Sequence, residues 1–181
     1  MNMFYLSTSP QECAEWSVNS HCVKMILESA QLLSTAHRVL DGVQYIDASS
    51  GRKIKRWKLD DAREGFLYSA THVNHPSAVW CRETAGNYAF LWHYLEEHCK
   101  EYTYRYGKVH KVETSGLLES LKHQPNSIRL ALFTLPPSAM DTKYIISEDA
   151  RINYRNYYKV GKAHLHKWKA PASPPSWIME N

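Results

Sequence analysis

The chain has 181 residues, of which 44% are hydrophobic and 22% are charged. These values are ordinary for a folded protein of about one domain, and they exclude a wholly disordered chain, a collagen repeat and a coiled coil. No apolar run is long enough for a membrane-spanning helix, and the first residues lack the basic and apolar regions of a signal peptide. We therefore expect one domain over residues 1–181, no membrane partner, and a cytoplasmic location.

The net charge of +4 is unevenly distributed along the chain. Residues 51–64 carry six basic and three acidic groups, and residues 151–181 carry six basic groups and one acidic group. A basic loop at about 43–60 and a basic C-terminal end on a near-neutral body favour a local anion-binding surface. Nucleic acid, a nucleotide and a phosphate all fit this description.

Helix signals dominate the first half of the chain. The capping box Ser9-Pro10-Gln11-Glu12 predicts a short helix over about 10–18. A long helix fits about 21–40, and Gly42 stands where a helix often ends. The stretch 43–60 is interpreted as a surface loop or a short hairpin. An aspartate at 60 or 61 predicts the cap of a further helix through about residue 71.

The second half also reads as helices separated by loops. The string Asn74-His75-Pro76-Ser77 predicts the start of a helix that runs to about Tyr106 and stops at Gly107. A shorter helix is expected over 113–123, followed by an ordered loop over 124–142 that packs on the core. A last helix over about 147–167 precedes a Pro-rich tail at about 168–181. The expected fold is mainly α, a compact single-domain helical bundle with long ordered loops.

The first long helix carries the sharpest functional signal, because polar side chains occupy only one narrow arc of its helical wheel. This polar stripe consists of Lys24, Glu28, Gln31, Thr35 and Arg38, with His21 at its edge. Such a helix is expected to be buried on most sides, so its charged groups must be paired or face a wet cavity. The stripe therefore predicts a functional cleft. The alternative is a simple i,i+4 ion pair between Lys24 and Glu28 on a solvated strip.

Two histidines precede the helix that starts near Pro76. His72 and His75, together with Glu83 or His21, offer metal ligands, but no spacing marks a third ligand, so no metal site is predicted. Asn74 and His75 at this helix start are instead expected to bind an anion or to cap the helix.

The last predicted helix combines basic and aromatic side chains on one face: Arg151, Tyr154, Arg155, Tyr158 and Lys162. Basic groups interleaved with tyrosines can hold phosphates while the rings pack on a sugar or a base. The alternative is a solvated basic face whose tyrosines bury their rings in the core. Asn87, near the start of the helix after Pro76, is a further candidate to face the polar stripe and bind substrate. No glycine-rich phosphate loop is present, and no cofactor is predicted.

Several strings in the chain carry a resemblance to known families. The segments 21–33, Asn74-His75-Pro76-Ser77, 102–108 and 154–158 resemble a family of uncharacterised tailed-bacteriophage proteins. More remotely, the layout is similar to the phage pyrimidine-dimer DNA glycosylase/AP-lyase family, in which a histidine on an N-terminal helix precedes a catalytic glutamate by seven residues, as His21 precedes Glu28. The run 157–163 is similar to that family's aromatic–basic C-terminal run. The chain departs from the family pattern at Asn2, Leu27 and Gln31, where the family has a small residue and two basic residues.

This resemblance implies an all-α, DNA-acting enzyme of the host cytoplasm that excises a base without a cofactor. Glu28 would stabilise the cationic sugar or activate water as the glycosidic bond breaks, with Lys24 as a nearby charge or an amine nucleophile. His21 and Gln31 would orient the substrate. The phosphates would be held by Arg38, Arg151, Arg155 and Lys162. Two alternatives stay open: an enzyme of free or modified nucleotide metabolism, and a non-catalytic protein that binds a nucleotide or nucleic acid.

Overall fold

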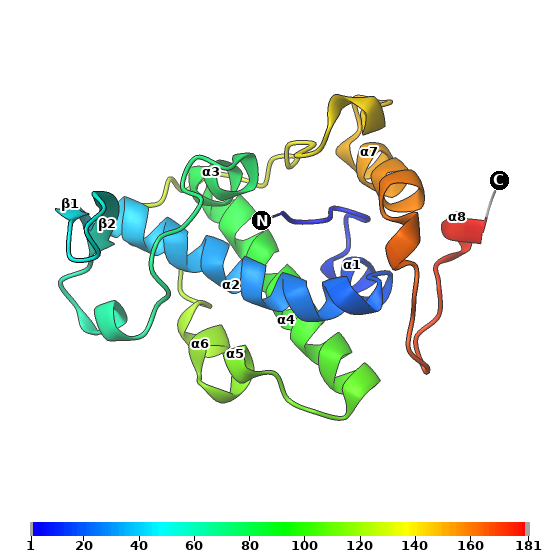
Figure 1. Cartoon of the computed structure of the whole chain (residues 1–181), viewed down its shortest axis with the longest axis horizontal. Helices are drawn as coiled ribbons and strands as arrows, with labels where there is room; N and C mark the ends of the chain where they lie inside the picture. Colours follow the sequence, from blue (N-terminus) through cyan, green and yellow to red (C-terminus); the bar gives the residue numbers. More distant parts are fainter. Residues whose placement is uncertain (1, 180–181) are drawn as a thin grey trace.

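The computed structural model describes residues 2–179, and Figure 1 shows the arrangement of its elements. The chain is predominantly helical with one two-stranded antiparallel sheet, so the mainly α prediction is confirmed in its coarse form and the all-α description is corrected. The helices and strands are α1 (Pro10–Glu15), α2 (Asn19–Asp41), β1 (Val43–Asp47), β2 (Ile54–Lys58), α3 (Pro76–Glu83), α4 (Ala85–Tyr106), α5 (Lys111–Thr114), α6 (Leu117–Ser120), α7 (Ala150–Asn156) and α8 (Ser176–Met179).

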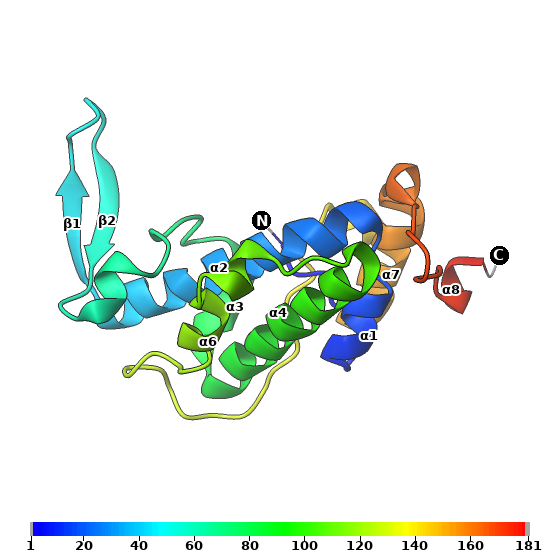
Figure 2. The same ribbon diagram turned by 90° about the horizontal axis from the view of Figure 1, so that it is seen from below.

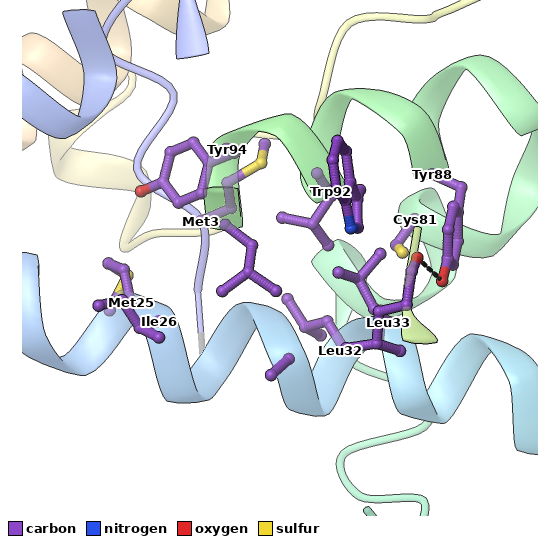
Figure 3. Packing of buried hydrophobic residues seen from close by; sticks show 14 of the residues in the cluster. Met3, Met25, Ile26, Leu32, Leu33, Cys81, Tyr88, Trp92 and Tyr94 are labelled. Carbon is purple, nitrogen blue, oxygen red and sulfur yellow. Dashed lines mark hydrogen bonds between the residues drawn. The ribbon is translucent and has the colours of Figure 1, made fainter. Parts of the chain in front are cut away.

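The two longest helices, α2 and α4, pack against each other and carry the core. In Figure 3, Leu32 and Leu33 of α2 lie toward Trp92 and Tyr88 of α4, and Ile26 lies further along α2 on the side of Tyr94. The N-terminal segment 3–6 is buried alongside them and belongs to the same hydrophobic cluster. Burial of these side chains supplies the main driving force for folding, at roughly 25 cal/mol for each Å² of apolar surface removed from water.

The predicted helix over 76–106 is interrupted at Thr84. This residue is extended (φ −142°, ψ 153°), its Oγ1 accepts a hydrogen bond from Asn87 N, and the same hydroxyl donates to Leu132 O. The interruption creates a second helix start, where Ala85 N and Gly86 N donate to backbone carbonyls of the loop 124–142. The loop prediction is confirmed, and Gly107 ends α4 in the left-handed conformation as expected (φ 62°).

The predicted helix over 61–71 is wrong, because the structure has only a single 3₁₀ turn at Ala62–Gly65. The guanidinium of Arg38 reaches from α2 and donates hydrogen bonds to the carbonyls of Glu64, Leu67 and Tyr68. These bonds hold the segment in an irregular path along α2. The preceding stretch forms the hairpin that was one of the two sequence interpretations, with β1 and β2 paired from Val43↔Lys58 to Asp47↔Ile54.

The last predicted helix is shorter than 147–167. Helix α7 ends at Asn156, continues as a π turn at Tyr157–Gly161, and gives way to a 3₁₀ turn at Ala163–Leu165. The Pro-rich tail then packs back on the body, where Trp168 Nε1 donates to Trp16 O at 3.2 Å. Positions 180 and 181 of the predicted tail lie outside the described residues.

Candidate functional site

The polar stripe of α2 divides into two halves with different surroundings. In the C-terminal half, Arg38 is buried, and its five N–H groups donate to Tyr68 O, Trp57 O, Leu67 O and both a carboxylate and a carbonyl oxygen of Glu64. Thr35 Oγ1 accepts from Thr71 N at 3.1 Å. This half is therefore covered by the segment 57–71. The predicted role of Arg38 in binding substrate phosphates is corrected, because the fold already uses every donor of its guanidinium.

Glu28 occupies the N-terminal half of the stripe. Its side chain is 11% exposed, its Oε1 lies 3.2 Å from Lys24 Nζ, and its Oε2 accepts a hydrogen bond from the backbone N of Asn2 at 2.9 Å. Lys24 is 63% exposed and lies on the solvent side of the pair. It is therefore not a desolvated amine, which the predicted role of Lys24 as an amine nucleophile requires. The alternative interpretation, a strip of polar residues fully exposed to solvent, is wrong for Glu28, whose carboxylate lies between the core and the solvent.

Asn2 fixes one side of this carboxylate by joining four parts of the chain. Its Oδ1 accepts from Tyr154 OH of α7 at 3.1 Å, and its Nδ2 donates to Ala139 O of the long loop at 2.9 Å. Its backbone N bonds to Glu28 of α2, and Ser77 Oγ of α3 lies 3.5 Å from its Oδ1. The position of Glu28 thus depends on contacts between residues that are far apart in the sequence.

His75 and Gln31 complete the surroundings of Glu28, since His75 interacts with its charge and Gln31 follows it by one helical turn. His75 is the N-cap of α3, where its Nδ1 accepts from Ser77 N at 3.2 Å. Burial lowers the pKa of His75, and the negative charge of Glu28 acts in the opposite direction. Gln31, one turn after Glu28, is half-buried and bonds to none of residues 2–179 through its side-chain amide. We call Asn2, Lys24, Glu28, Gln31 and His75 the Glu28 site.

His21 lies outside the Glu28 site, although it shares its helix. Its ring stacks on Phe4 with centroids 4.2 Å apart, and its Nδ1 is 2.7 Å from Tyr158 OH. Burial lowers the pKa of His21 to about 3, so the ring is neutral at physiological pH. The predicted substrate-orienting role is replaced by a packing role, because the ring is enclosed between the N-terminal segment and the π turn.

The basic and aromatic face predicted on the last helix does not form. Tyr154 and Tyr158 are fully buried and use their hydroxyls within the core. Arg155 Nε donates to Leu6 O, and its guanidinium stacks 5.0 Å from the ring centroid of Trp16. Arg151 pairs with Asp149, and Lys162 Nζ lies 4.9 Å from the ring centroid of Tyr157. The interpretation in which the tyrosines bury their rings is the correct one for Tyr154 and Tyr158.

Asn87 is also a structural residue. It is 0% exposed, its Nδ2 donates to Trp80 O and Thr134 Oγ1, and its Oδ1 accepts from Thr134 N. These bonds attach the loop 124–142 to the start of α4. Because all of these atoms are enclosed, Asn87 is excluded from contact with substrate, contrary to the sequence prediction.

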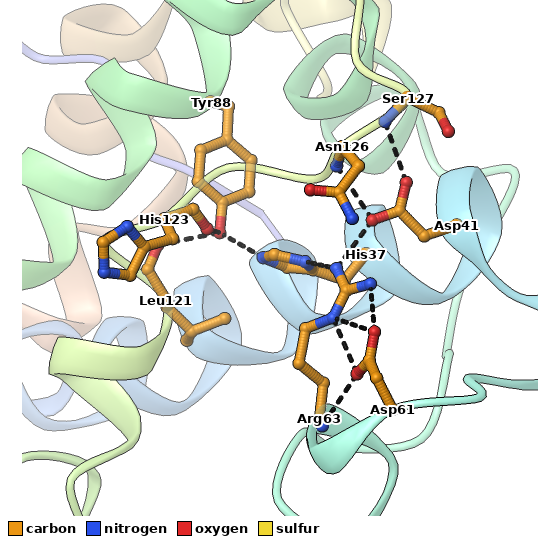
Figure 4. A network of polar contacts seen from close by, with 9 residues as sticks. All are labelled: His37, Asp41, Asp61, Arg63, Tyr88, Leu121, His123, Asn126 and Ser127. Atoms are coloured by element: carbon orange, nitrogen blue, oxygen red, sulfur yellow. Dashed lines mark hydrogen bonds and ion pairs between the residues drawn. The ribbon is translucent and has the colours of Figure 1, made fainter.

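A polar network at the C-terminal end of α2 was not predicted. Figure 4 shows His37 between Tyr88, whose OH is 2.8 Å from His37 Nε2, and Arg63, whose Nη1 is 2.9 Å from His37 Nδ1. Arg63 also pairs with Asp41, whose carboxylate accepts from Asn126 N and Ser127 N. The network ties the turn at 61–63, the segment 121–127 and Tyr88 of α4 to α2, and its only sequence signal is the helical spacing of His37 and Asp41.

A groove lies at the base of the hairpin, between it and the segment 70–74. Its volume is about 480 Å³, and its lining includes Lys55, Arg56 and Trp57 from β2 and His72 and Asn74 from the opposite wall. Asn74, predicted to bind substrate, is exposed in this groove and immediately precedes His75 of the Glu28 site. The groove residues His72 and Trp57 were not assigned to substrate binding from the sequence, because no local spacing brings 57 and 72 together.

The described residues 2–179 include no group of three or more His, Cys, Asp or Glu side chains suited to holding a metal ion. Within the same range, no helix combines the length and apolarity needed to cross a bilayer. In comparison with known proteins, no protein family, no curated protein and no solved structure matches the chain.

Proposed function

We propose that this protein cleaves N-glycosidic bonds in DNA, with Glu28 as the catalytic carboxylate. One observation carries the proposal. Glu28 is mostly shielded from water, yet one of its carboxylate oxygens accepts a hydrogen bond from Asn2 N and the other pairs with Lys24 Nζ. The side-chain amide of Gln31, one helical turn further on, forms no hydrogen bond with any of residues 2–179. Carboxylates that are fixed in this way at a solvent margin can stabilise a positive charge that develops in a transition state.

The chemistry requires a carboxylate close to the sugar carbon C1′. As the bond from C1′ to the base nitrogen lengthens, positive charge builds on the sugar, and the Glu28 carboxylate stabilises it. A water molecule then adds to C1′, and its proton leaves with the base, so the products are the free base and the sugar hemiacetal. The target nucleotide must leave the helical stack to reach the carboxylate. We assign contact with the neighbouring phosphate to Lys24, whose side chain is 63% exposed.

The test is Glu28→Gln, which keeps an oxygen acceptor for Asn2 N but removes the negative charge. Wild-type protein is incubated with oligonucleotides that each carry one altered base, including a pyrimidine dimer, uracil and 5-hydroxymethyluracil, and alkali-labile strand breaks are counted. We expect E28Q to lose activity by at least a hundredfold, in line with the usual contribution of such groups. Glu119→Gln, which removes a 76% exposed carboxylate on α6, should retain wild-type activity.

Two outcomes would reject the proposal. Activity of E28Q equal to wild type would show that Glu28 is not the catalytic group. Cleavage of nucleoside monophosphates with no cleavage of any oligonucleotide would assign the site to free nucleotides instead of DNA.

A further inference from the structure

The β1–β2 hairpin projects from the helical body as a separate arm. Figures 1 and 2 show both strands extending away from the end of α2. An isolated two-stranded hairpin is only marginally stable in water. Here its base is held by Arg38, which donates to Trp57 O at 3.0 Å. The fold therefore uses a buried arginine to support an arm that contributes little to the core.

The arm concentrates positive charge. Residues 43–58 contain five basic residues and one acidic residue, a net +4 that equals the net charge of the whole chain. Asp47 pairs with Arg56 at 3.8 Å, whereas Arg52, Lys53 and Lys55 form no ion pair with any of residues 2–179. Unpaired exposed cations on a projecting element create a field that attracts polyanions.

The groove at the base of the arm adds an aromatic surface to this charge. Strand register places Gln44 opposite Trp57 and Ile46 opposite Lys55, and since residues two apart share a strand face, Lys55 and Trp57 lie on the same face. The facing wall includes His72, whose φ of 49° is unusual for a residue with a side chain. A volume of about 480 Å³ falls in the range of small-ligand sites.

We propose that the hairpin and its groove bind a single strand of nucleic acid, with Arg52, Lys53 and Lys55 contacting phosphates and Trp57 stacking on an unpaired base. Alternating cations and an aromatic platform are the chemistry by which proteins hold single strands. The inference deepens the proposed function, because it assigns a second contact for the same class of partner. Asn74 of the groove directly precedes His75 of the Glu28 site in the chain.

The experiment measures binding by fluorescence anisotropy, using labelled 15-nucleotide single strands and the matching duplex over a range of salt concentrations. The triple variant Arg52→Gln/Lys53→Gln/Lys55→Gln should bind the single strand at least tenfold more weakly at low salt. Its slope of log affinity against log salt should fall by about 2, as expected for three lost phosphate contacts. Trp57→Leu should weaken single-strand binding about tenfold while leaving the salt slope unchanged.

A matched control removes the same charge elsewhere. Lys108→Gln/Lys111→Gln/Lys167→Gln takes three exposed lysines from other parts of the surface and should bind within twofold of wild type. Equal weakening in both triple variants would overturn the inference, since it would reflect net charge alone. Tighter binding to the duplex with no effect of Trp57→Leu would also overturn it, as would binding only to vesicles containing phosphatidylglycerol.

E28Q separates this inference from the proposed function. If E28Q binds normally and the hairpin variant does not, the hairpin assignment stands whatever the result of the cleavage assay. If the hairpin variant binds like wild type while E28Q loses cleavage, the hairpin assignment fails and the proposed function stands.

Discussion

Glu28 Oε2 accepts a hydrogen bond from Asn2 N at 2.9 Å, across 26 residues of sequence. The contact joins the first described residue of the chain to the middle of α2. It also explains how a carboxylate on a mostly apolar helix is tolerated with only 11% of its side chain exposed: one of its oxygens is satisfied by a backbone donor and the other by a lysine.

The stability role of this bond can be separated from its charge. Glu28→Ala removes the acceptor for Asn2 N and should lower the free energy of unfolding by about 1–2 kcal/mol. Glu28→Gln retains an acceptor and should lower it by less than about 0.5 kcal/mol, since an ion pair whose cation, Lys24, is 63% exposed contributes little. Urea denaturation of both variants checks this, and equal losses in the two would contradict the assigned role of the Asn2 bond.

Gly86 marks the closest approach between α4 and the loop 124–142. A Cβ at this position would lie 2.2 Å from Phe133 N and 2.5 Å from Leu132 C, both backbone atoms. Gly86→Ala should therefore destabilise the protein by about 3 kcal/mol, because the loop must move and its bonds to Ala85 N and Gly86 N must stretch. Gly65→Ala is the matched control, since a Cβ there meets nothing within 4 Å. Thermal melting of the two variants compares them, and an unchanged melting temperature for G86A would refute the close approach.

His37 should make the protein sensitive to mild acid. Burial, with the charge of Arg63, lowers the pKa of His37 from 6.5 to about 4. Below pH 6.5 the unfolded chain takes up a proton that the folded chain does not accept until pH falls to about 4. Stability is therefore fully present above pH 6.5 and falls as the pH is lowered, with a loss of roughly 2 kcal/mol from this residue at pH 5.

The measurement is the free energy of unfolding of wild type and His37→Gln between pH 7 and pH 5. The variant should be less stable at pH 7, but its dependence on pH should be shallower by up to about 1.4 kcal/mol per pH unit. His164→Gln removes an exposed histidine and should keep the wild-type slope. A His37→Gln slope identical to wild type would show that folding does not lower the pKa of His37.

Arg38 should matter for folding rather than for binding. Arg38→Lys replaces five fixed N–H donors with three on a point charge, and it leaves backbone carbonyls of the segment 64–68 without partners. We expect a loss of about 3 kcal/mol or more in the free energy of unfolding. Arg129→Lys, at an exposed arginine, should change it by less than about 0.5 kcal/mol. An R38K protein with wild-type stability but weakened binding to oligonucleotides would restore the phosphate-binding role.

Local features of the fold were predictable where neighbours in sequence decide them. The Ser9 cap, the Gly107 stop and the long apolar helix around Leu32 all follow from residues within a few positions of each other. The break at Thr84 was not predictable, because the helix pattern continues through it. Thr84 leaves the helix because its hydroxyl finds Leu132 O, 48 residues away.

The candidate site shows the same division. Helical periodicity correctly placed Lys24 and Glu28 one turn apart and predicted that their helix would be largely buried. Periodicity also assigned Arg38 to the same stripe, although the two halves of the stripe have different partners. A helical wheel records direction around one axis and carries no information about which distant segment packs along that direction.

The amino-acid sequence alone therefore determined the helical character, the polar stripe and the basic charge of the stretch 43–60, since propensity, periodicity and charge are local properties. Only the tertiary structure decided that Asn2 holds Glu28, that Arg38 anchors the segment 57–68, and that Tyr154 and Tyr158 are core residues. The physical reason is that a buried polar group must find a partner, and in this protein those partners come from segments tens of residues away, brought together by the packing of α2 and α4.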